Sequence, residues 1–372
     1  MYHRDTKSIQ TITLGTKCPK LEGVITIKLK QNQLTLIRHL CQFGTLDYQS
    51  CLRLLNPVDG KPASYSFRPL TKNRYISKRE NGSVGVLAKG RELFPNVKTL
   101  ITLGGGSTSE RVNTISRTAS FFAAIGIKSV YFPELTAQKC FVPSTCWRKI
   151  RDGILSTVRF TGILFIGEHR LAVYDIGDGK MEWQLRAERS LFYCQFHTEF
   201  PTHATGMLLI CDDDKRDKVA IQIIRETMYQ RKQLIDNESY EERTRPVRYA
   251  RTPIRVAKYY EHVYLTTPKS LVVSLQRIKS EKKDIAELRG NCAICWNNKL
   301  GDFENYPRRY FVNSTTDLLK YVYFFSEAKS NGIIKYSIFI PKNDLPILRM
   351  YPKILETEGL EIYEYKRPQN SG

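Results

Sequence analysis

Residues 74–90 read RYISKRENGSVGVLAKG, and this stretch decides the fold of the N-terminal part of the chain. Two short β-like runs, residues 74–80 and 84–90, lie on either side of Asn81 and Gly82. The Asn-Gly dipeptide supplies the positive φ angles that a tight hairpin turn needs. The stretch therefore predicts a two-stranded hairpin with basic side chains on both strands.

Two short helices are predicted upstream of this hairpin. Residues 33–43, QLTLIRHLCQF, carry apolar side chains at the spacing of one helix face, and Gly44 ends that helix. In residues 45–56, either Thr45 or Asp47 can serve as the N-cap of the second helix.

A third helix is predicted directly before the hairpin. Ser64 can cap residues 64–74, SYSFRPLTKNR, whose exposed side carries Arg68, Lys72 and Arg74. Two helices, a basic helix and a hairpin, in that order, are typical of a winged helix-turn-helix domain. We place this domain at residues 30–98.

The charge of the chain is strongly positive and unevenly distributed. Its 372 residues have a net charge of +21, and the first 98 residues hold 17 Lys and Arg against 6 Asp and Glu. A surplus of this size favours a polyanionic partner, and nucleic acid is the obvious candidate. The composition therefore predicts an N-terminal binding face for double-stranded DNA.

The winged helix-turn-helix arrangement assigns roles to the basic residues. The third helix enters the major groove, and the hairpin contacts the flanking phosphates. The alternative is an ordinary solvated surface, since exposed basic residues are common. The predicted DNA-binding residues are Arg68, Lys72 and Arg74 on the helix, and Lys78, Arg79, Lys89 and Arg91 on the hairpin and just after it.

Residues 99–152 are predicted to form a helical linker. Within them, residues 111–127, RVNTISRTASFFAAIGI, carry apolar side chains on one helix face. That face can pack on either domain of the same chain or against a second copy, so a homodimer is one of the expected states.

Residues 153–372 alternate between strand-like and helical patterns, which predicts one α/β domain with a mixed sheet. A buried strand is predicted at residues 206–214, followed by a helix at 215–235. Further strands are predicted at residues 262–267 and 271–276.

One constellation in this domain can support catalysis. Asp175 ends a strand and Glu182 belongs to the next, an arrangement that can hold the divalent metal of a nuclease. Against this, Gln184 stands where such a site has a lysine, and residues 175–183 also fit a polar hairpin. A metal-dependent nuclease or nicking accessory is therefore the alternative to a non-catalytic binding protein, which is our first hypothesis.

Two other polar patterns have simple explanations. The acids at 212–214 follow a buried strand, where α/β sheets place ligands, but they can also cap the next helix. Cys292 and Cys295 have the spacing of half a zinc site without a matching second pair. No nucleotide-binding or hydrolase motif occurs, so the sequence predicts neither a cofactor nor a metal.

A second basic strip lies at residues 243–260, RTRPVRYARTPIRVAKYY, with tyrosines between its cations. Such a strip can follow a phosphate backbone and stack on exposed bases. It can equally be an extended loop docked on acidic neighbours. Its candidate contacts are Arg245, Arg248, Arg251 and Arg255.

The cysteines and the hydropathy pattern bear on the compartment. The nine cysteines are scattered and mostly lie among apolar neighbours, which favours reduced core thiols. No run of about 18 apolar residues occurs, and the first ten residues lack the apolar core of a signal peptide. We therefore expect a cytoplasmic protein without a membrane span.

Three stretches together resemble the replication-relaxation family of mobile-element proteins: LTKNRYISKRENGSVGVLAKGRELF (70–94), RFTGILFIGEHRLAVYDIGDGKMEW (159–183) and GMLLICDDDKRDKVAIQII (206–224). The resemblance implies a winged helix followed by an α/β domain similar to restriction nucleases, degenerate here because Gln184 replaces the expected lysine. It also implies a DNA-binding accessory of a plasmid or integrative element that acts in replication, mobilisation during conjugation or transcriptional control. Relaxase or replication proteins would be its partners.

Overall fold

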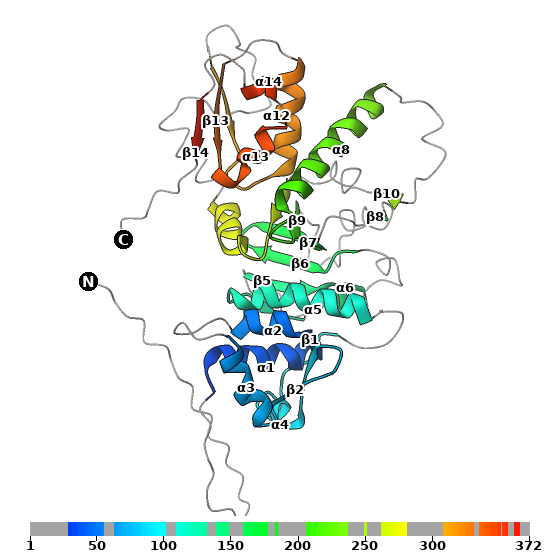
Figure 1. Cartoon of the computed structure of the whole chain (residues 1–372). Coiled ribbons are helices and arrows are strands. Elements are labelled where there is room, and N and C mark those ends of the chain that lie inside the picture. The colour runs from blue at the N-terminus through cyan, green and yellow to red at the C-terminus, as the bar shows by residue number, and fades with distance from the viewer. Residues whose placement is uncertain are drawn as a thin grey trace, which may run out of the picture. The chain divides into compact units, whose positions relative to one another are not determined.

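The structure is a computed structural model that describes residues 29–55, 63–101, 109–131, 139–148, 159–177, 183–184, 206–236, 249–250, 262–280, 308–330, 335–350, 352–355 and 361–364. The chain divides into two compact units, Met1–Ser129 and Val130–Gly372 (Figure 1). This division falls inside residues 99–152, the segment that the sequence analysis treats as a linker.

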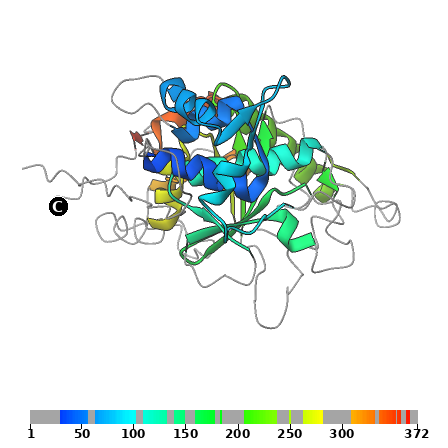
Figure 2. The same cartoon turned by 90° about the horizontal axis from the view of Figure 1, so that it is seen from below.

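The N-terminal unit combines helices with a small antiparallel sheet. Its helices are α1 (Gln31–Phe43), α2 (Tyr48–Leu55), α3 (Ala63–Lys72), α4 (Ala88–Glu92) and α5 (Ser109–Ala124). Its strands are β1 (Thr45–Asp47), β2 (Ile76–Lys78), β3 (Ser83–Val86) and β4 (Lys128–Ser129). The three helices and the hairpin expected from the sequence are therefore confirmed, and Figure 2 shows the hairpin projecting beyond the helices of this unit.

The starts of α2 and α3 resolve two capping predictions. The Asp47 carboxylate accepts a hydrogen bond from the Ser50 amide at 2.8 Å, so Asp47 caps α2. The prediction that Ser64 caps the third helix is wrong, because α3 already begins at Ala63 and Ser64 lies inside it.

The sheet of this unit has the strand order β1-β3-β2 and closes the helical core. Leu46 of β1 pairs with Val84 of β3, and Ile76 of β2 pairs with Val86. Leu46, Ile76 and Val84 are buried in one cluster with residues of the helices, among them Leu36, Ile37, Leu40, Leu55 and Leu70. Burial of this apolar surface fixes the hairpin on the helices.

Helix α5 packs against α1, α2 and β1. The Ser116 hydroxyl donates to the Thr45 carbonyl at 2.6 Å, and His39 Nε2 lies 3.2 Å from Ser116 Oγ. Ala123 near the end of α5 packs on the hydrophobic cluster of the unit. The apolar residues expected on one face of residues 111–127 are buried, among them Val112, Ile115 and Phe122. Helix α5 belongs to the N-terminal unit.

The C-terminal unit is built on a mixed sheet. The strands of this sheet in the unit are β5 (Lys139–Pro143), β6 (Gly162–Ile166), β7 (His169–Gly177), β9 (Gly206–Cys211) and β11 (His262–Thr266), in the order β11-β9-β7-β6-β5. Strands β7, β9 and β11 run parallel, and β5, β6 and β7 are antiparallel. The mixed α/β class predicted from the sequence is therefore confirmed.

Further elements flank this sheet. The helices are α6 (Ser144–Arg148), α8 (Arg216–Asp236), α12 (Leu318–Ser330), α13 (Leu345–Leu348) and α14 (Pro352–Leu355), with a 3-10 turn η2 (Lys342–Asp344). Three parallel strands form a second sheet in the order β12 (Arg308–Val312), β13 (Lys335–Ile340) and β14 (Glu361–Glu364). A two-residue pair joins β8 (Trp183–Gln184) to β10 (Tyr249–Ala250).

The strand predicted at residues 271–276 is wrong, because residues 271–280 are helical. The cause lies just upstream, where the Ser270 amide approaches Thr267 Oγ1 at 3.3 Å and the Thr267 amide donates to Ser270 Oγ at 3.0 Å. This reciprocal pair has the geometry of a capping box, and it closes the turn from which the helix continues at residue 271. The cap outweighs the β preference of the valines that follow.

Five of the nine cysteines fall among the described residues, and all five are buried free thiols: Cys41, Cys51, Cys140, Cys146 and Cys211. Burial raises the pKa of Cys140 to about 11 and that of Cys211 to about 12. These thiols are protonated core residues, as expected.

Within the described residues, the structure contains no helix with the length and apolar character needed to cross a membrane.

Candidate nucleic-acid interface

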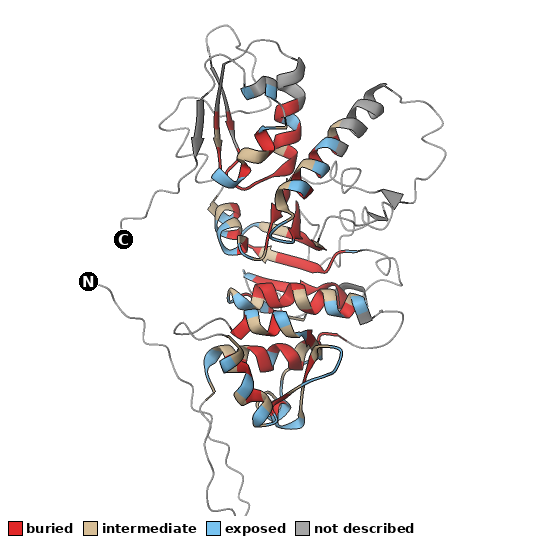
Figure 3. Ribbon diagram, in the orientation of Figure 1, coloured by how far each residue is buried: buried red, intermediate tan, exposed pale blue. Residues whose placement is uncertain are grey.

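Helix α3 has one apolar side and one basic side. Phe67 and Leu70 are buried in the core of the unit. Tyr65, Arg68 and Lys72 are exposed, and their spacing of three and four residues places them in one stripe along the opposite side (Figure 3). The packing of Phe67 and Leu70 in the core therefore turns the basic stripe toward solvent.

The end of α3 places Arg74 in a conformation that non-glycine residues rarely adopt. Arg74 has φ 56°, in the left-handed region. The Tyr75 amide donates to the Leu70 carbonyl at 3.0 Å and the Arg74 amide to the Thr71 carbonyl at 3.1 Å. These two bonds form a Schellman motif, in which glycine normally occupies the position of Arg74. The exposed Arg74 side chain is thus held at the junction of α3 and β2.

The hairpin turn differs in detail from the one predicted. Gly82 has φ 77°, and Asn81 is not among the residues with positive φ. The Gly82 amide donates to the Arg79 carbonyl at 3.0 Å, and the Arg79 amide donates to the Ser83 carbonyl at 2.7 Å. This is a three-residue loop that ends in a glycine bulge, so only Gly82 needs the left-handed conformation.

The strand predicted at 84–90 is too long. Strand β3 ends at Val86, and α4 follows from Ala88 because the Gly90 and Arg91 amides both donate to the Leu87 carbonyl. A Cβ on Gly90 would come within 2.4 Å of the Tyr75 carbonyl oxygen, so glycine permits α4 to lie close to the hairpin. Lys89 and Arg91 are therefore on a short helix rather than on the second strand.

Three of the predicted cations lie over tyrosine rings of the same unit. Lys78 Nζ is 4.0 Å from the ring centre of Tyr48, and Lys89 Nζ is 4.7 Å from that of Tyr75. The guanidinium carbon of Arg68 is 5.7 Å from the ring centre of Tyr65. Cation–π contacts of this kind restrict the direction of long basic side chains without neutralising their charge. These contacts leave little signal in the sequence. Tyr48 and Tyr75 are far along the chain from Lys78 and Lys89, and Tyr65 is one residue among several on the exposed side of α3.

Of the seven predicted residues of the N-terminal unit, two lie on α3, Arg74 follows α3, two lie on the hairpin and two lie on α4. Each of the seven is exposed, and none forms an ion pair within the described part of the chain. The described acids of this unit are few: Asp47, Glu80, Glu92 and Glu110. The seven cations therefore retain their charge in water, and we call them the basic surface.

The proposed catalytic pair cannot be assembled from the described residues. Asp175 is buried in β7, where it pairs in register with Ile210, while Glu182 lies outside the described residues. Gln184 is in β8. The part of the chain that the structure describes contains no group of three His, Cys, Asp or Glu side chains that could hold a metal. The second basic strip, Arg245, Arg248, Arg251 and Arg255, also lies outside the described residues.

The acids after β9 contact neighbouring lysines instead of capping α8. Asp213 Oδ1 accepts a hydrogen bond from the Lys269 amide at 3.2 Å, and Asp214 lies 3.0 Å from Lys215 Nζ. Helix α8 begins at Arg216, and the Val219 amide donates to the Lys215 carbonyl, so Lys215 occupies the N-cap position. The expectation that one of residues 212–214 caps this helix is therefore wrong.

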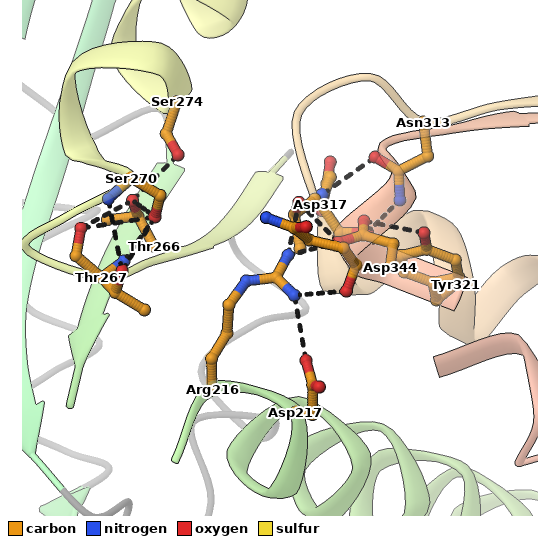
Figure 4. Close-up of polar contacts among 12 residues, drawn as sticks. Arg216, Asp217, Thr266, Thr267, Ser270, Ser274, Asn313, Asp317, Tyr321 and Asp344 are labelled. Atoms are coloured by element: carbon orange, nitrogen blue, oxygen red, sulfur yellow. Dashed lines mark hydrogen bonds and ion pairs between the residues drawn. The ribbon is translucent and has the colours of Figure 1, made fainter. Parts of the chain in front are cut away.

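A buried ionic network forms at the start of α8 (Figure 4). The Arg216 guanidinium donates to Asp344, to Thr316 Oγ1 at 3.1 Å and to Asp217 Oδ1 at 3.1 Å. Asp344 is fully buried and also accepts a hydrogen bond from the Tyr321 hydroxyl at 2.8 Å. Burial opposes the charged form of Arg216, but the Asp344 carboxylate outweighs it and raises the pKa of Arg216. This network joins α8 to the segments before α12 and α13.

Comparison with known proteins adds no relative: no family model matches the chain, and neither a curated protein nor a solved structure matches it significantly.

Proposed function

We propose that the N-terminal unit is a winged helix-turn-helix domain and that the protein binds double-stranded DNA through it. The order α1-α2-α3-β2-β3 supports this assignment, together with the core that holds the hairpin against the three helices. In this arrangement α3 lies in the major groove and the hairpin crosses the flanking phosphates.

The observation that carries the proposal is the basic surface itself. Its seven cations are exposed and unpaired within the described structure, although acids are available elsewhere in the chain to neutralise them. A concentration of unpaired positive charge on one helix and one hairpin attracts the phosphate backbone and releases its counterions. Between residues 68 and 92 the acids are Glu80 and Glu92, against seven cations, so the stretch keeps a net positive charge.

The biological setting is a further part of the proposal, and the resemblance to the replication-relaxation family is its ground. We propose a DNA-binding accessory of a plasmid or integrative element, with relaxase or replication proteins as partners. A homodimer would bring two copies of α3 to paired half-sites. The basic surface supports DNA binding alone and does not discriminate among replication, mobilisation and transcriptional control.

The experiment is a salt titration of DNA binding by the full chain, measured by fluorescence anisotropy with a labelled duplex and a single strand of the same sequence. The variant neutralises Lys72, Arg74, Lys78 and Arg79 to glutamine. We expect tight, salt-dependent binding of the duplex by the wild type. In the variant, the slope of log K against log salt should be shallower by about one unit for each phosphate that the protein no longer contacts.

The control variant removes the same amount of charge from exposed residues of the same unit outside the basic surface: Arg38, Arg53, Lys98 and Lys128. It should keep most of the wild-type slope. Equal reductions of the slope in the two variants would show a general effect of net charge, and an unchanged slope in the folded test variant would remove its four substituted residues from the interface.

A further inference from the structure

Resting on the proposed function, we propose that Tyr65 and Arg68 read two neighbouring base pairs: Arg68 binds a guanine, and Tyr65 contacts the 5-methyl group of an adjacent thymine. The pair would make a thymine–guanine step, or its 5-methylcytosine–guanine equivalent, the centre of the recognised sequence.

The first ground is the exposure of Tyr65. Its relative exposure is 58%, the highest among the large hydrophobic residues in the described part of the chain. A single exposed aromatic residue is common on protein surfaces. Tyr65, however, lies in the stripe with Arg68 and Lys72, on the side of α3 opposite to the buried Phe67 and Leu70. An apolar ring thus lies at one end of the basic stripe of α3.

The second ground is the contact between the two side chains. The Arg68 guanidinium carbon lies 5.7 Å from the Tyr65 ring centre. Three residues of helix span roughly 4.5 Å along its axis, and base pairs are stacked about 3.4 Å apart. A ring and a guanidinium in contact can therefore reach adjacent base pairs but not distant ones.

The third ground is the chemistry of the two groups. In the major groove, a guanidinium binds O6 and N7 of guanine through two parallel hydrogen bonds, and an apolar side chain contacts the thymine methyl. The ring face holds the planar guanidinium in one direction, which favours this two-point contact over a single phosphate contact. The lysines of the basic surface lack such a planar fork and suit phosphates.

The test begins with selection of the preferred duplex from a random library by the full chain. Single atoms of that duplex are then removed: each thymine is replaced by deoxyuridine, which lacks only the methyl, and each guanine by 7-deazaguanine, which lacks the N7 acceptor. For the wild type we expect one thymine whose replacement weakens binding about fourfold, beside one guanine whose replacement weakens binding about fivefold or more.

The variants assign each effect to its side chain. Tyr65→Ala should lose the sensitivity to the thymine methyl and should reduce the sensitivity to guanine N7 without abolishing it, because Arg68 remains but has lost the ring that directs it. Arg68→Ala should lose the sensitivity to guanine N7 and keep the sensitivity to the thymine methyl. Tyr65→Phe keeps the ring and should keep the methyl effect. Both residues are exposed, so these variants should fold normally, which circular dichroism can verify.

The failure of this inference differs from the failure of the proposed function. Salt-dependent duplex binding without a methyl effect in the wild type, or with a methyl effect that survives in Tyr65→Ala, would overturn the inference and leave the function standing. Absence of duplex binding by the wild type would overturn both.

Discussion

The basic surface of the N-terminal unit and the Arg216 network of the C-terminal unit use the same kind of side chain in opposite ways. The seven cations of the basic surface are exposed and have no carboxylate partner in the described structure. Arg216 is 12% exposed and is paired with Asp344, which is fully buried. Unpaired charge in water is available to a partner molecule, whereas paired charge in the core holds segments of the same chain together.

The two units also contain one strained residue each. Among the described residues, the non-glycine residues with positive φ are Arg74 and Thr316, both at 56°. The Thr316 hydroxyl bonds to Asp344 and Arg216, so the strain at Thr316 serves a buried network. The Arg74 side chain makes no contact of this kind in the described structure, so the fold gains nothing from its arginine. The exposed Arg74 side chain is therefore not used by the fold, unlike the Thr316 hydroxyl.

The largest expected effect tests the buried side of this comparison. Asp344→Ala leaves the Arg216 guanidinium buried without its main partner, and we expect the C-terminal unit to lose about 3 to 5 kcal/mol of stability. Urea unfolding followed by fluorescence measures this loss. Asp217→Ala is the matched control, because Asp217 also accepts a hydrogen bond from Arg216 but is half exposed, and it should cost about 1 kcal/mol or less.

A loss below about 1 kcal/mol for Asp344→Ala would show that Arg216 finds water or another acceptor. The Arg216–Asp344 pair would then contribute little to the stability of the C-terminal unit, and buried and exposed cations would not differ in this respect.

A smaller effect is expected at His39, a buried ionisable group with no counter-charge among the described residues. His39 is buried and stacked on Phe43, and Ser116 donates to Thr45, so Ser116 accepts from His39 Nε2–H and the ring is neutral. Burial lowers the pKa of His39 to about 3. Below about pH 6.5 the imidazole of His39 is therefore protonated in the unfolded chain but not in the folded chain. The free energy of unfolding is highest above about pH 6.5 and falls as the pH is lowered.

Between pH 7 and pH 4 this single group should reduce the stability of the N-terminal unit by about 3 kcal/mol. His39→Gln retains a donor for Ser116 without the titrating ring, so its unfolding midpoint should depend less on pH than that of the wild type. Parallel pH profiles for the two proteins would show that His39 is solvated or paired in the folded state.

Much of the N-terminal unit was predictable from the sequence because its signals are local. The apolar spacing in residues 33–43 predicted α1, and Asn81-Gly82 predicted the hairpin between β2 and β3. The alternation of strand and helix patterns also predicted the mixed α/β class. These features depend on residues that lie within one turn or one hairpin of each other.

The wrong predictions have tertiary or capping causes. Residues 271–276 favour a strand by composition, but the Thr267–Ser270 cap starts a helix there. The second strand of the hairpin, β3, ends at Val86 rather than at residue 90, because Gly90 allows α4 to approach Tyr75. Neither the tyrosines under Lys78 and Lys89 nor the pairing of Arg216 with Asp344 could be predicted, since contacts between residues so distant in sequence leave no local pattern.

The smallest expected effect separates stability from binding at the two strained residues. Arg74→Gly removes the steric cost of the left-handed conformation, so the N-terminal unit should gain about 1 kcal/mol of stability. The same change removes one cation of the basic surface, so duplex binding should weaken and its salt slope should fall by about one unit.

Thr316→Gly relieves the same φ but deletes the hydroxyl that contacts Asp344 and Arg216, so it should destabilise the C-terminal unit and leave duplex binding unchanged. Thermal melts and anisotropy on the two variants measure both properties. A gain in stability at Arg74 without weaker binding would mean that its strain serves no DNA contact, and α3 would then act through Arg68 and Lys72 alone.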